Sequence, residues 1–333
     1  MKLVDQFQNF IRRHRLLAYA DTVIIGVSAG ADSVCLTHLM RAIKMEWGLH
    51  LILAHFNHHL RIDSGGDERY VAKLSQRLGI PYVVGHWDRS KETRPGSLEE
   101  KAREARINFF TRLSQKHKAQ AIALAHTQNE LSETVLLRIL RGTGLQGMRG
   151  ILPKTSLAGF VFIRPLLEIK REMIEEYLKK EGVPWREDKT NRETIFLRNK
   201  IRLHLLPLLK QYNPNITLSL ARLAQNSALD YDYLRKSAEK VFKKIVRISR
   251  SKKSVTINLS NLQKEHPALK RLVIRLCVEK IKGDTNSLTL THALEIEDLI
   301  RERPEGSQVN LPSGLTVEKD AKNLVIMTAV RRD

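Results

Sequence analysis

The chain has 333 residues, a formal net charge of +21 and two cysteines, Cys35 and Cys277. It has no run of about 18 apolar residues, no signal-peptide layout and no CxxC pair, which excludes transmembrane, disulfide-framework and zinc-ribbon classes and predicts a cytoplasmic protein. The charge favours nucleic acid as the partner, bound through phosphates by Lys and Arg, because aromatic residues make up only 6% of the chain.

The first half of the chain alternates between strand-like and helical segments, after an amphipathic helix at the start. Strands are predicted at 22–27, 49–56, 81–85 and 119–125. Helices are predicted after them, at about 31–46, 67–79, 97–117 and 128–141. The alternation predicts an α/β fold with a parallel, doubly wound, Rossmann-like sheet. Ligands of such sheets bind beyond the carboxyl ends of the strands.

The second half is predicted to hold more helices and a smaller domain. A glycine-rich loop at 141–153 precedes helical segments, and the NPN sequence at 213–215 interrupts them. We place the domain boundary there, between an N-terminal domain, 1–215, and a basic α+β domain, 216–333, whose charge suits nucleic acid. The second domain would contain a long basic helix or helix pair, two further helices, a strand and a final hairpin.

The stretch IIGVSAGADSVCL, residues 24–36, joins the first strand to the first long helix of the sheet. The first amides of a helix lack partners within it and bind phosphate, and small residues let the backbone approach closely. An acid beside phosphate makes sense if Mg²⁺ lies between them. We therefore predict a nucleotide phosphate cradle, which is neither a Walker A loop nor GxGxxG. Its residues would be Ser28, Ala29, Gly30, Ala31, Asp32 and Ser33. The sequence DSGGDE at 63–68 is predicted to be only a surface loop.

The segment SAGADS resembles the SGGxDS loop of the N-type ATP pyrophosphatases, also called the PP-loop superfamily. The resemblance implies that ATP is split into AMP and pyrophosphate, leaving an adenylated intermediate. Ala29 stands where the family usually has glycine. Alanine fits there if its φ is negative, whereas a positive φ would weaken ATP binding.

Further segments resemble, in order, those of bacterial tRNA(Ile)-lysidine synthetases. They include LAHFNHHLRIDSGGDERYV, GSLEEKAREARINFF, AHTQNELSETVLLRILRGTGLQGMRGI and LRNKIRLHLLPLL. The resemblance implies that ATP adenylates the wobble cytidine in the CAU anticodon of tRNA(Ile). The amine of free L-lysine then displaces AMP and gives lysidine. It leaves open whether the enzyme is a homodimer.

A lysine site needs acids for the ammonium groups and a cation for the carboxylate. HTQNELSET supplies His126 at a strand end, with Glu130 and Glu133 on one helix face. The family usually has an aspartate near Glu130, and Asn129 replaces an acid common in many members. The attacking amine must lose a proton, and either His126 or Glu133 is a candidate to accept it.

Other candidate residues lie on neighbouring segments. Arg103 and Arg106 share a helix face, where they would contact phosphates or the lysine carboxylate, or else pair with Glu99 or Glu100. His55, at a strand end, would border the nucleotide, and no metal site is predicted in HFNHH because further ligands are missing. The basic segment after 185 is expected to contact tRNA phosphates, as are the helices of 216–253. Its cations are Arg186, Lys189, Arg192, Arg198, Lys200 and Arg202.

Two alternatives remain at this point. One is another PP-loop enzyme that modifies tRNA, such as a thiolase, although those resemble each other in paired cysteines. The other is a non-catalytic RNA-binding relative with a degenerate nucleotide loop. The departures at Ala29, Asn129 and Glu130 keep the second alternative open, whereas Asp32 and Glu133 argue against it.

Overall fold

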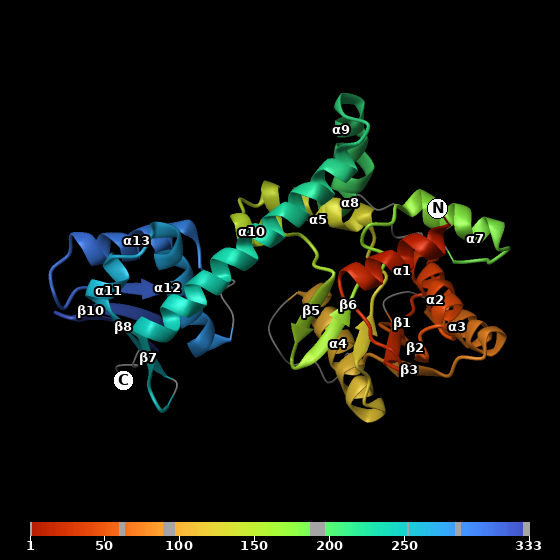
Figure 1. Ribbon diagram of the computed structural model, residues 1–333, viewed down its shortest axis with the longest axis horizontal. Helices are drawn as coiled ribbons and strands as arrows, with labels where there is room; N and C mark the ends of the chain where they lie inside the picture. The colour runs from red at the N-terminus through yellow and green to blue at the C-terminus, as the bar shows by residue number, and fades with distance from the viewer. Residues whose placement is uncertain are drawn as a thin grey trace. The chain divides into compact units, whose positions relative to one another are not determined.

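The computed structural model describes residues 2–59, 64–88, 97–186, 197–251, 253–283 and 288–328. It forms two compact units, Met1–Ala228 and Leu229–Asp333. The division falls inside helix α10 (Ile216–Ile245), which is coloured cyan-green in Figure 1, rather than near residue 215. The reason is that the first turns of α10 pack on the core of unit 1 through Leu220, Ala221 and Ala224.

Unit 1 contains a six-stranded sheet in the order β3-β2-β1-β4-β6-β5. The strands are β1 (Thr22–Gly26), β2 (His50–Asn57), β3 (Tyr82–His86), β4 (Ala121–Ala123), β5 (Lys154–Leu157) and β6 (Phe160–Ile163). All neighbouring strands pair in parallel except β5 with β6. The predicted α/β fold is confirmed. The β5–β6 hairpin was not predicted; its turn uses Ala158 and Gly159 at positive φ.

Helices cover both faces of this sheet. Val23 and Ile25 of β1 belong to a core shared with α1, α2 and α7, whereas Ile24 packs with Phe110 of α4 on the other face. This alternation along one strand produces the doubly wound arrangement. The helices before the second unit are α1 (Leu3–Arg13), α2 (Ala31–Ile43), α3 (Ser64–Leu78), α4 (Leu98–His117), α5 (Gln128–Leu140), α6 (Leu145–Met148), α7 (Arg171–Lys180), α8 (Leu197–Lys200), the π-helix η3 (Ile201–Leu205) and α9 (Leu206–Tyr212).

Helix α3 begins at Ser64, so most of the DSGGDE stretch is helical and the prediction of a surface loop there is wrong. Its glycines nevertheless have a use. A Cβ at Gly66 would collide with the guanidinium of Arg186, which forms an ion pair with Asp67 at 2.8 Å. Gly66 therefore leaves space for the ion pair between Arg186 and Asp67, which a local sequence pattern does not predict.

Unit 2 has its own hydrophobic core and a five-stranded antiparallel sheet in the order β7-β8-β11-β10-β9. The strands are β7 (Val246–Ile248), β8 (Ser254–Asn258), β9 (Gln308–Leu311), β10 (Leu315–Lys319) and β11 (Asn323–Thr328), and the helices are α11 (Leu259–Gln263), α12 (Pro267–Lys282) and α13 (Leu290–Arg301). The α+β character predicted for this region is confirmed. Within the described part of the chain, no helix is both long and apolar enough to span a membrane.

Candidate functional site

The loop between β1 and α2 lies at the carboxyl edge of the sheet, where the sequence places the phosphate cradle. Ser33 ties the loop together: its hydroxyl accepts a hydrogen bond from the Ser28 amide at 3.0 Å and donates one to the Gly30 carbonyl at 3.0 Å. Within the described residues, the amides of Gly30, Ala31 and Asp32 have no hydrogen-bond partner. Three unpartnered amides at a helix N-terminus can bind an anion such as phosphate.

Ala29 adopts a positive φ of 64° in this loop, the conformation in which alanine is strained. For an L-residue it costs about 1–2 kcal/mol. The side chain is fully buried, and the carbonyl accepts a hydrogen bond from the backbone amide of Arg186 at 3.0 Å. The surrounding structure thus holds the loop in a shape that glycine would adopt more easily.

Replacing Ala29 by glycine is expected to change the free energy of unfolding by less than about 1 kcal/mol. The variant is expected to bind ATP at least as tightly as the wild type. Relief of strain offsets the greater freedom of the unfolded glycine chain and the loss of one buried methyl group. Ala29→Val should destabilise the protein by about 2 kcal/mol or more, because a β-branched residue at positive φ must also fit a packed interior. Urea unfolding and titration with ATP measure both effects.

The matched control is Ala158, which also has a positive φ, of 51°, but is exposed in the β5–β6 turn. Ala158→Val introduces the same kind of backbone strain without overpacking, so its effect should be clearly smaller than that of Ala29→Val. Equal effects at the two positions would show that the buried loop does not constrain residue 29.

Asp32 lies in the first turn of α2, beside the unpartnered amides. Its Oδ2 accepts a hydrogen bond from Nη1 of Arg171 at 2.6 Å, whereas its Oδ1 is buried without a partner in the described structure. Burial raises the pKa of Asp32 to about 6, although the Arg171 charge opposes the shift. A buried, unpartnered carboxylate oxygen next to phosphate-binding amides fits Mg²⁺, which usually takes one or two carboxylates and completes its shell with phosphates and water.

His55 lies near the end of β2, next to the start of the cradle. It is buried, and its Nδ1 donates a hydrogen bond to the carbonyl of Val27 at 2.8 Å. Its Nε2 is buried and has no partner among the described residues. The ring is thus fixed beside the loop, as its predicted place at the edge of a nucleotide site requires.

Glu130 and Glu133 lie on α5 in different surroundings. Glu130 belongs to a capping box: its Oε2 accepts a hydrogen bond from the Thr127 amide at 3.1 Å. The Glu133 side chain is only 2% exposed and accepts hydrogen bonds from Arg198 and Arg202 at 2.6–3.2 Å. Its lone pairs are committed to two guanidinium groups, so this geometry favours a positioning role over proton transfer.

His126 lies after β4 in a strongly cationic environment. Burial lowers the pKa of His126 to about 3, with further contributions from surrounding arginines. These are Arg164, Arg106, Arg198 and Arg103. The imidazole is therefore neutral at physiological pH and a weak proton acceptor. The cluster of positive charge around it suits an anion better than another cation.

Arg106 connects this cationic cluster with the acids of α5. Burial and the charge of Arg103 lower the pKa of Arg106, and Glu130 acts in the opposite direction. Glu130 also interacts electrostatically with Asp32. The structure thus brings Asp32, Arg106, Glu130, Glu133 and His126 into one connected site, although they come from three separate segments of the sequence.

The basic segment after 185 is tied to unit 1 through ion pairs. Arg198 and Arg202 bind Glu133, and Arg186 binds Asp67. Three cations that were expected to contact tRNA phosphates are thus held in ion pairs within unit 1, because buried or half-buried carboxylates require them. Lys200 is exposed, and Lys189 and Arg192 lie outside the described residues.

Two arginines of the site were missed by sequence reasoning. Arg171 is the first residue of α7, where the helix dipole disfavours a cation. An arginine at a predicted helix start was therefore the sequence feature that could have indicated a contact with a distant acid. Arg164 follows β6 and donates hydrogen bonds to the Leu152 carbonyl and the Thr155 hydroxyl, while its Nε is buried without a partner in the described structure. Burial lowers the pKa of Arg164 to about 10.

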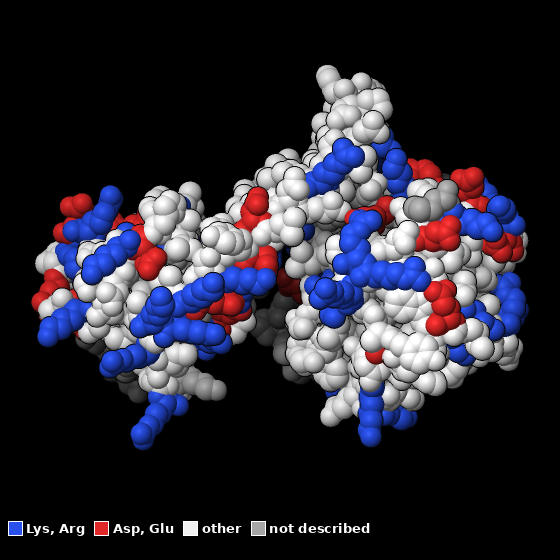
Figure 2. Space-filling model, viewed as in Figure 1, with Lys and Arg blue, Asp and Glu red and all other residues white. Residues whose placement is uncertain are grey.

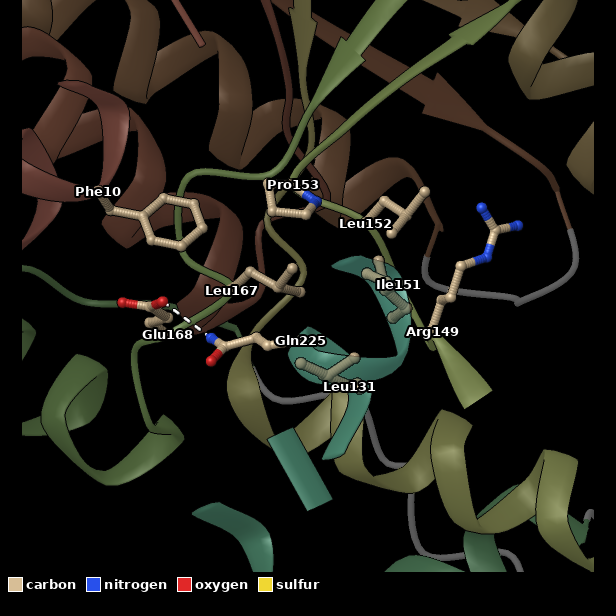
Figure 3. Close-up of a pocket in the computed structure, with 11 residues that line it drawn as sticks. Phe10, Leu131, Arg149, Ile151, Leu152, Pro153, Leu167, Glu168 and Gln225 are labelled. Atoms are coloured by element: carbon tan, nitrogen blue, oxygen red, sulfur yellow. Dashed lines mark hydrogen bonds between the residues drawn. The ribbon is translucent and has the colours of Figure 1, made fainter. Parts of the chain in front are cut away.

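A small pocket of unit 1 lies elsewhere and contains none of the predicted site residues. Figure 3 shows apolar side chains such as Phe10, Leu131 and Ile151 around it, with Gln225 donating a hydrogen bond to Glu168 at 2.9 Å. Leu131 follows Glu130 on α5, so successive residues of this helix face the pocket and the charged site. Leu131 belongs to the hydrophobic core of unit 1, so it anchors α5 beside the charged site.

Comparison with known proteins places this site in a family. A family model described as a PP-loop domain matches residues 1–209. The tRNA(Ile)-lysidine synthase of Clostridioides difficile strain 630 is 36% identical over 328 residues, which cover 97% of this chain and 70% of that protein. The tRNA(Ile)-lysidine synthase of Caldanaerobacter subterraneus subsp. tengcongensis is 32% identical over 333 residues, covering 97% of this chain and 69% of that protein.

A solved structure resembles the fold of the chain at low identity. The U34-tRNA thiolase NcsA from Methanococcus maripaludis, solved with its 4Fe-4S cluster, aligns with a TM-score of 0.58. The alignment covers 67% of this chain and 77% of that chain at 16% identity. At this identity the likeness extends to the fold alone.

Proposed function

The chain belongs to the PP-loop domain family and, within it, to the tRNA(Ile)-lysidine synthases, and we propose that it joins free L-lysine to the wobble cytidine of tRNA(Ile) bearing a CAU anticodon, using ATP, in the cytoplasm. The reaction would form a carbon–nitrogen bond, which makes the enzyme a ligase. One observation carries the proposal: a loop that suits phosphate, with a carboxylate oxygen of Asp32 that has no partner among the described residues, adjoins a site where acids and arginines meet around Glu130.

In the first step, the cytidine oxygen attacks the α-phosphorus of ATP. A bond forms between that oxygen and phosphorus, the bond to the β-phosphate oxygen breaks, and pyrophosphate leaves. The amides at the start of α2 would bind the phosphates, and Asp32 would hold Mg²⁺, which supplies charge neutralisation when bound. Arg106 and its neighbours would stabilise the negative charge that develops on the phosphates.

In the second step, a neutral amine of lysine attacks the cytidine carbon that carries the adenylate. The carbon–nitrogen bond forms, the carbon–oxygen bond breaks, AMP leaves, and the proton that the nitrogen loses would pass to the carboxylate that binds the amine. Glu130 is the better candidate to bind the amine, because its carboxylate accepts one hydrogen bond from Thr127 and lies 4.0 Å from Arg198, whereas Glu133 binds two arginines closely. The arginines around His126 would bind the lysine carboxylate.

The two alternatives from the sequence are less well supported. Cys35 and Cys277 are both fully buried, in different units, and burial raises the pKa of both thiols, so neither is suited to carry sulfur. The departures at positions 129 and 130 have structural uses. The side chain of Asn129 accepts a hydrogen bond from the Arg171 amide, and Glu130 completes a capping box.

The proposal is tested by incubating the protein with ATP labelled at the α-phosphate, lysine and tRNA(Ile) carrying a CAU anticodon. We expect AMP release that depends on lysine, together with lysine in the tRNA. AMP release that depends on a sulfur donor would favour the thiolase alternative. Binding of tRNA with no turnover under any of these conditions would overturn the proposed function.

For tRNA binding we propose a stripe of lysines on unit 2, formed by Lys236, Lys240, Lys243 and Lys244. These exposed residues are spaced at i, i+4, i+7 and i+8, so they lie on one face of α10. Figure 2 shows Lys and Arg side chains gathered along this end of the helix. The stripe continues into exposed Arg247 of β7, which suits a run of phosphates.

Replacing Lys240, Lys243 and Lys244 together by alanine should weaken tRNA binding and make it less sensitive to salt. Each lost phosphate contact removes roughly 0.7–0.9 from the slope of log K against log salt concentration, so the triple variant should lose about 2–3. The measurement is tRNA affinity over a series of salt concentrations. Replacing exposed Lys179 and Lys180 of α7 is the control. An equal loss in that variant would show that net charge, rather than the stripe, determines binding.

A further inference from the structure

Arg171 occupies a position that helix physics disfavours. It is the first residue of α7, where the helix dipole disfavours a cation. The N-cap, Lys170, makes no capping hydrogen bond through its side chain. Both the charge of Arg171 and the start of the helix therefore need partners from elsewhere in the fold.

Three neighbours supply these partners. Nη1 of Arg171 donates to Oδ2 of Asp32 at 2.6 Å, and its Nε donates to Glu175, one helical turn further, at 2.8 Å. The backbone amide of Arg171 donates to Oδ1 of Asn129 at 3.0 Å. Asn129 therefore provides from α5 the cap that α7 lacks, and it lies directly before Glu130.

We propose that Arg171 is a positioning residue of the nucleotide site: it holds one oxygen of Asp32 so that the other is presented to the cation of the bound nucleotide, and Asn129 holds Arg171 in place. This inference rests on the proposed function, because it assigns the task of Arg171 within the same site. It explains why Oδ1 of Asp32 is buried yet unpartnered in the described structure while Oδ2 is bound.

The geometry supports positioning rather than general stabilisation. The Asp32 side chain is 21% exposed and that of Arg171 39%, so the pair is partly shielded from water and competing hydrogen bonds. Glu175 fixes the guanidinium from the other side, so the carboxylate meets a donor that is itself oriented. An ammonium group could replace the charge of Arg171 but could not bridge Asp32 and Glu175 with the same planar geometry.

The first experiment examines the protein without nucleotide, in EDTA, by urea unfolding. It compares Arg171→Ala, Asp32→Asn and the double variant in a double-mutant cycle. Arg171→Ala should lower the urea midpoint when Asp32 is present, because a buried carboxylate loses its partner, and should change it much less in the Asp32→Asn background. Additive effects would overturn the proposal, because Arg171 would then not act through Asp32.

The second experiment separates kcat from KM for AMP formation. Arg171→Ala should lower kcat at least about tenfold, with the KM for ATP changing less than about threefold, because the loop amides still bind the phosphates. Arg171→Lys should recover only part of the lost rate. Asn129→Ala should lower kcat less than Arg171→Ala does. Asn129→Asp should keep kcat closer to the wild-type value than Asn129→Ala does, because the side chains of Asn and Asp both offer an acceptor for the Arg171 amide.

Lys180→Ala, at the exposed far end of the same helix, is the matched control and should leave both constants unchanged. An active wild type with an unchanged kcat in Arg171→Ala would overturn this inference and leave the proposed function intact. This inference would also be overturned if the lower rate of Arg171→Ala were fully explained by a smaller fraction of folded protein at the assay temperature. A wild type that forms no AMP would overturn the proposed function itself.

Discussion

Replacing Asp32 by alanine is expected to lower lysine-dependent AMP formation by about 10²–10³-fold or more, while leaving tRNA affinity near that of the wild type. In the described structure Asp32 carries a buried, unpartnered oxygen beside the unpartnered amides of the loop, so its loss removes the group that would hold Mg²⁺. The proposed tRNA contacts lie on other residues. The measurements are release of labelled AMP and tRNA binding at a fixed salt concentration.

The folding control for this variant has a defined sign. Burial raises the pKa of Asp32 from 3.8 to about 6, so above pH 6 its ionisation opposes folding. Asp32→Ala is therefore expected not to lower the free energy of unfolding at pH 7, and urea unfolding of the variant at that pH separates a loss of activity from a loss of folded protein. A large fall in tRNA affinity would contradict the role assigned to Asp32.

Glu133→Ala is expected to have the largest effect on stability, lowering the free energy of unfolding by about 2–3 kcal/mol. The carboxylate is 2% exposed and binds Arg198 and Arg202, whose side chains are 42% and 35% exposed. Removing one partner of a fully buried pair costs about 3–5 kcal/mol, and the solvent around these arginines reduces that cost. Two guanidinium groups would also be left close together. Urea unfolding measures the change.

The matched control for Glu133 is Asp232, which pairs with Lys236 at 2.6 Å on the surface, with both side chains more than half exposed. Asp232→Ala should cost less than about 1 kcal/mol. Glu133→Gln should keep the shape of the side chain but still lose activity, because Arg198 and Arg202 would no longer be held in place. An unchanged stability of Glu133→Ala would contradict the inferred importance of the two arginine contacts.

These contacts give the two glutamates of α5 separate tasks. In the proposed function, Glu133 would organise the arginines, and Glu130, with the more accessible carboxylate, would bind a lysine ammonium group. Sequence reasoning grouped the two because both lie on one helix face. It could not tell them apart, because helical spacing specifies direction but not the partner that a side chain meets.

What the sequence determined was local. Alternating strands and helices predicted the α/β fold, and consecutive small and polar residues from Ser28 to Ser33 predicted the phosphate loop. Both predictions depend on the periodicity of apolar residues and on the types of residues adjacent in the chain, which can be read from the sequence. The family resemblance added the expected reaction, because several motifs occur in the same order as in the relatives.

Only the tertiary structure decided which charges meet. Arg171 lies 139 residues from Asp32, and Arg202 lies 69 residues from Glu133, so no spacing rule connects them. The same holds for the positive φ of Ala29 and for the division inside α10, which are set by packing against distant residues. Ion pairs and strained backbone are stabilised by neighbours in space, and the folded chain alone brings those neighbours together.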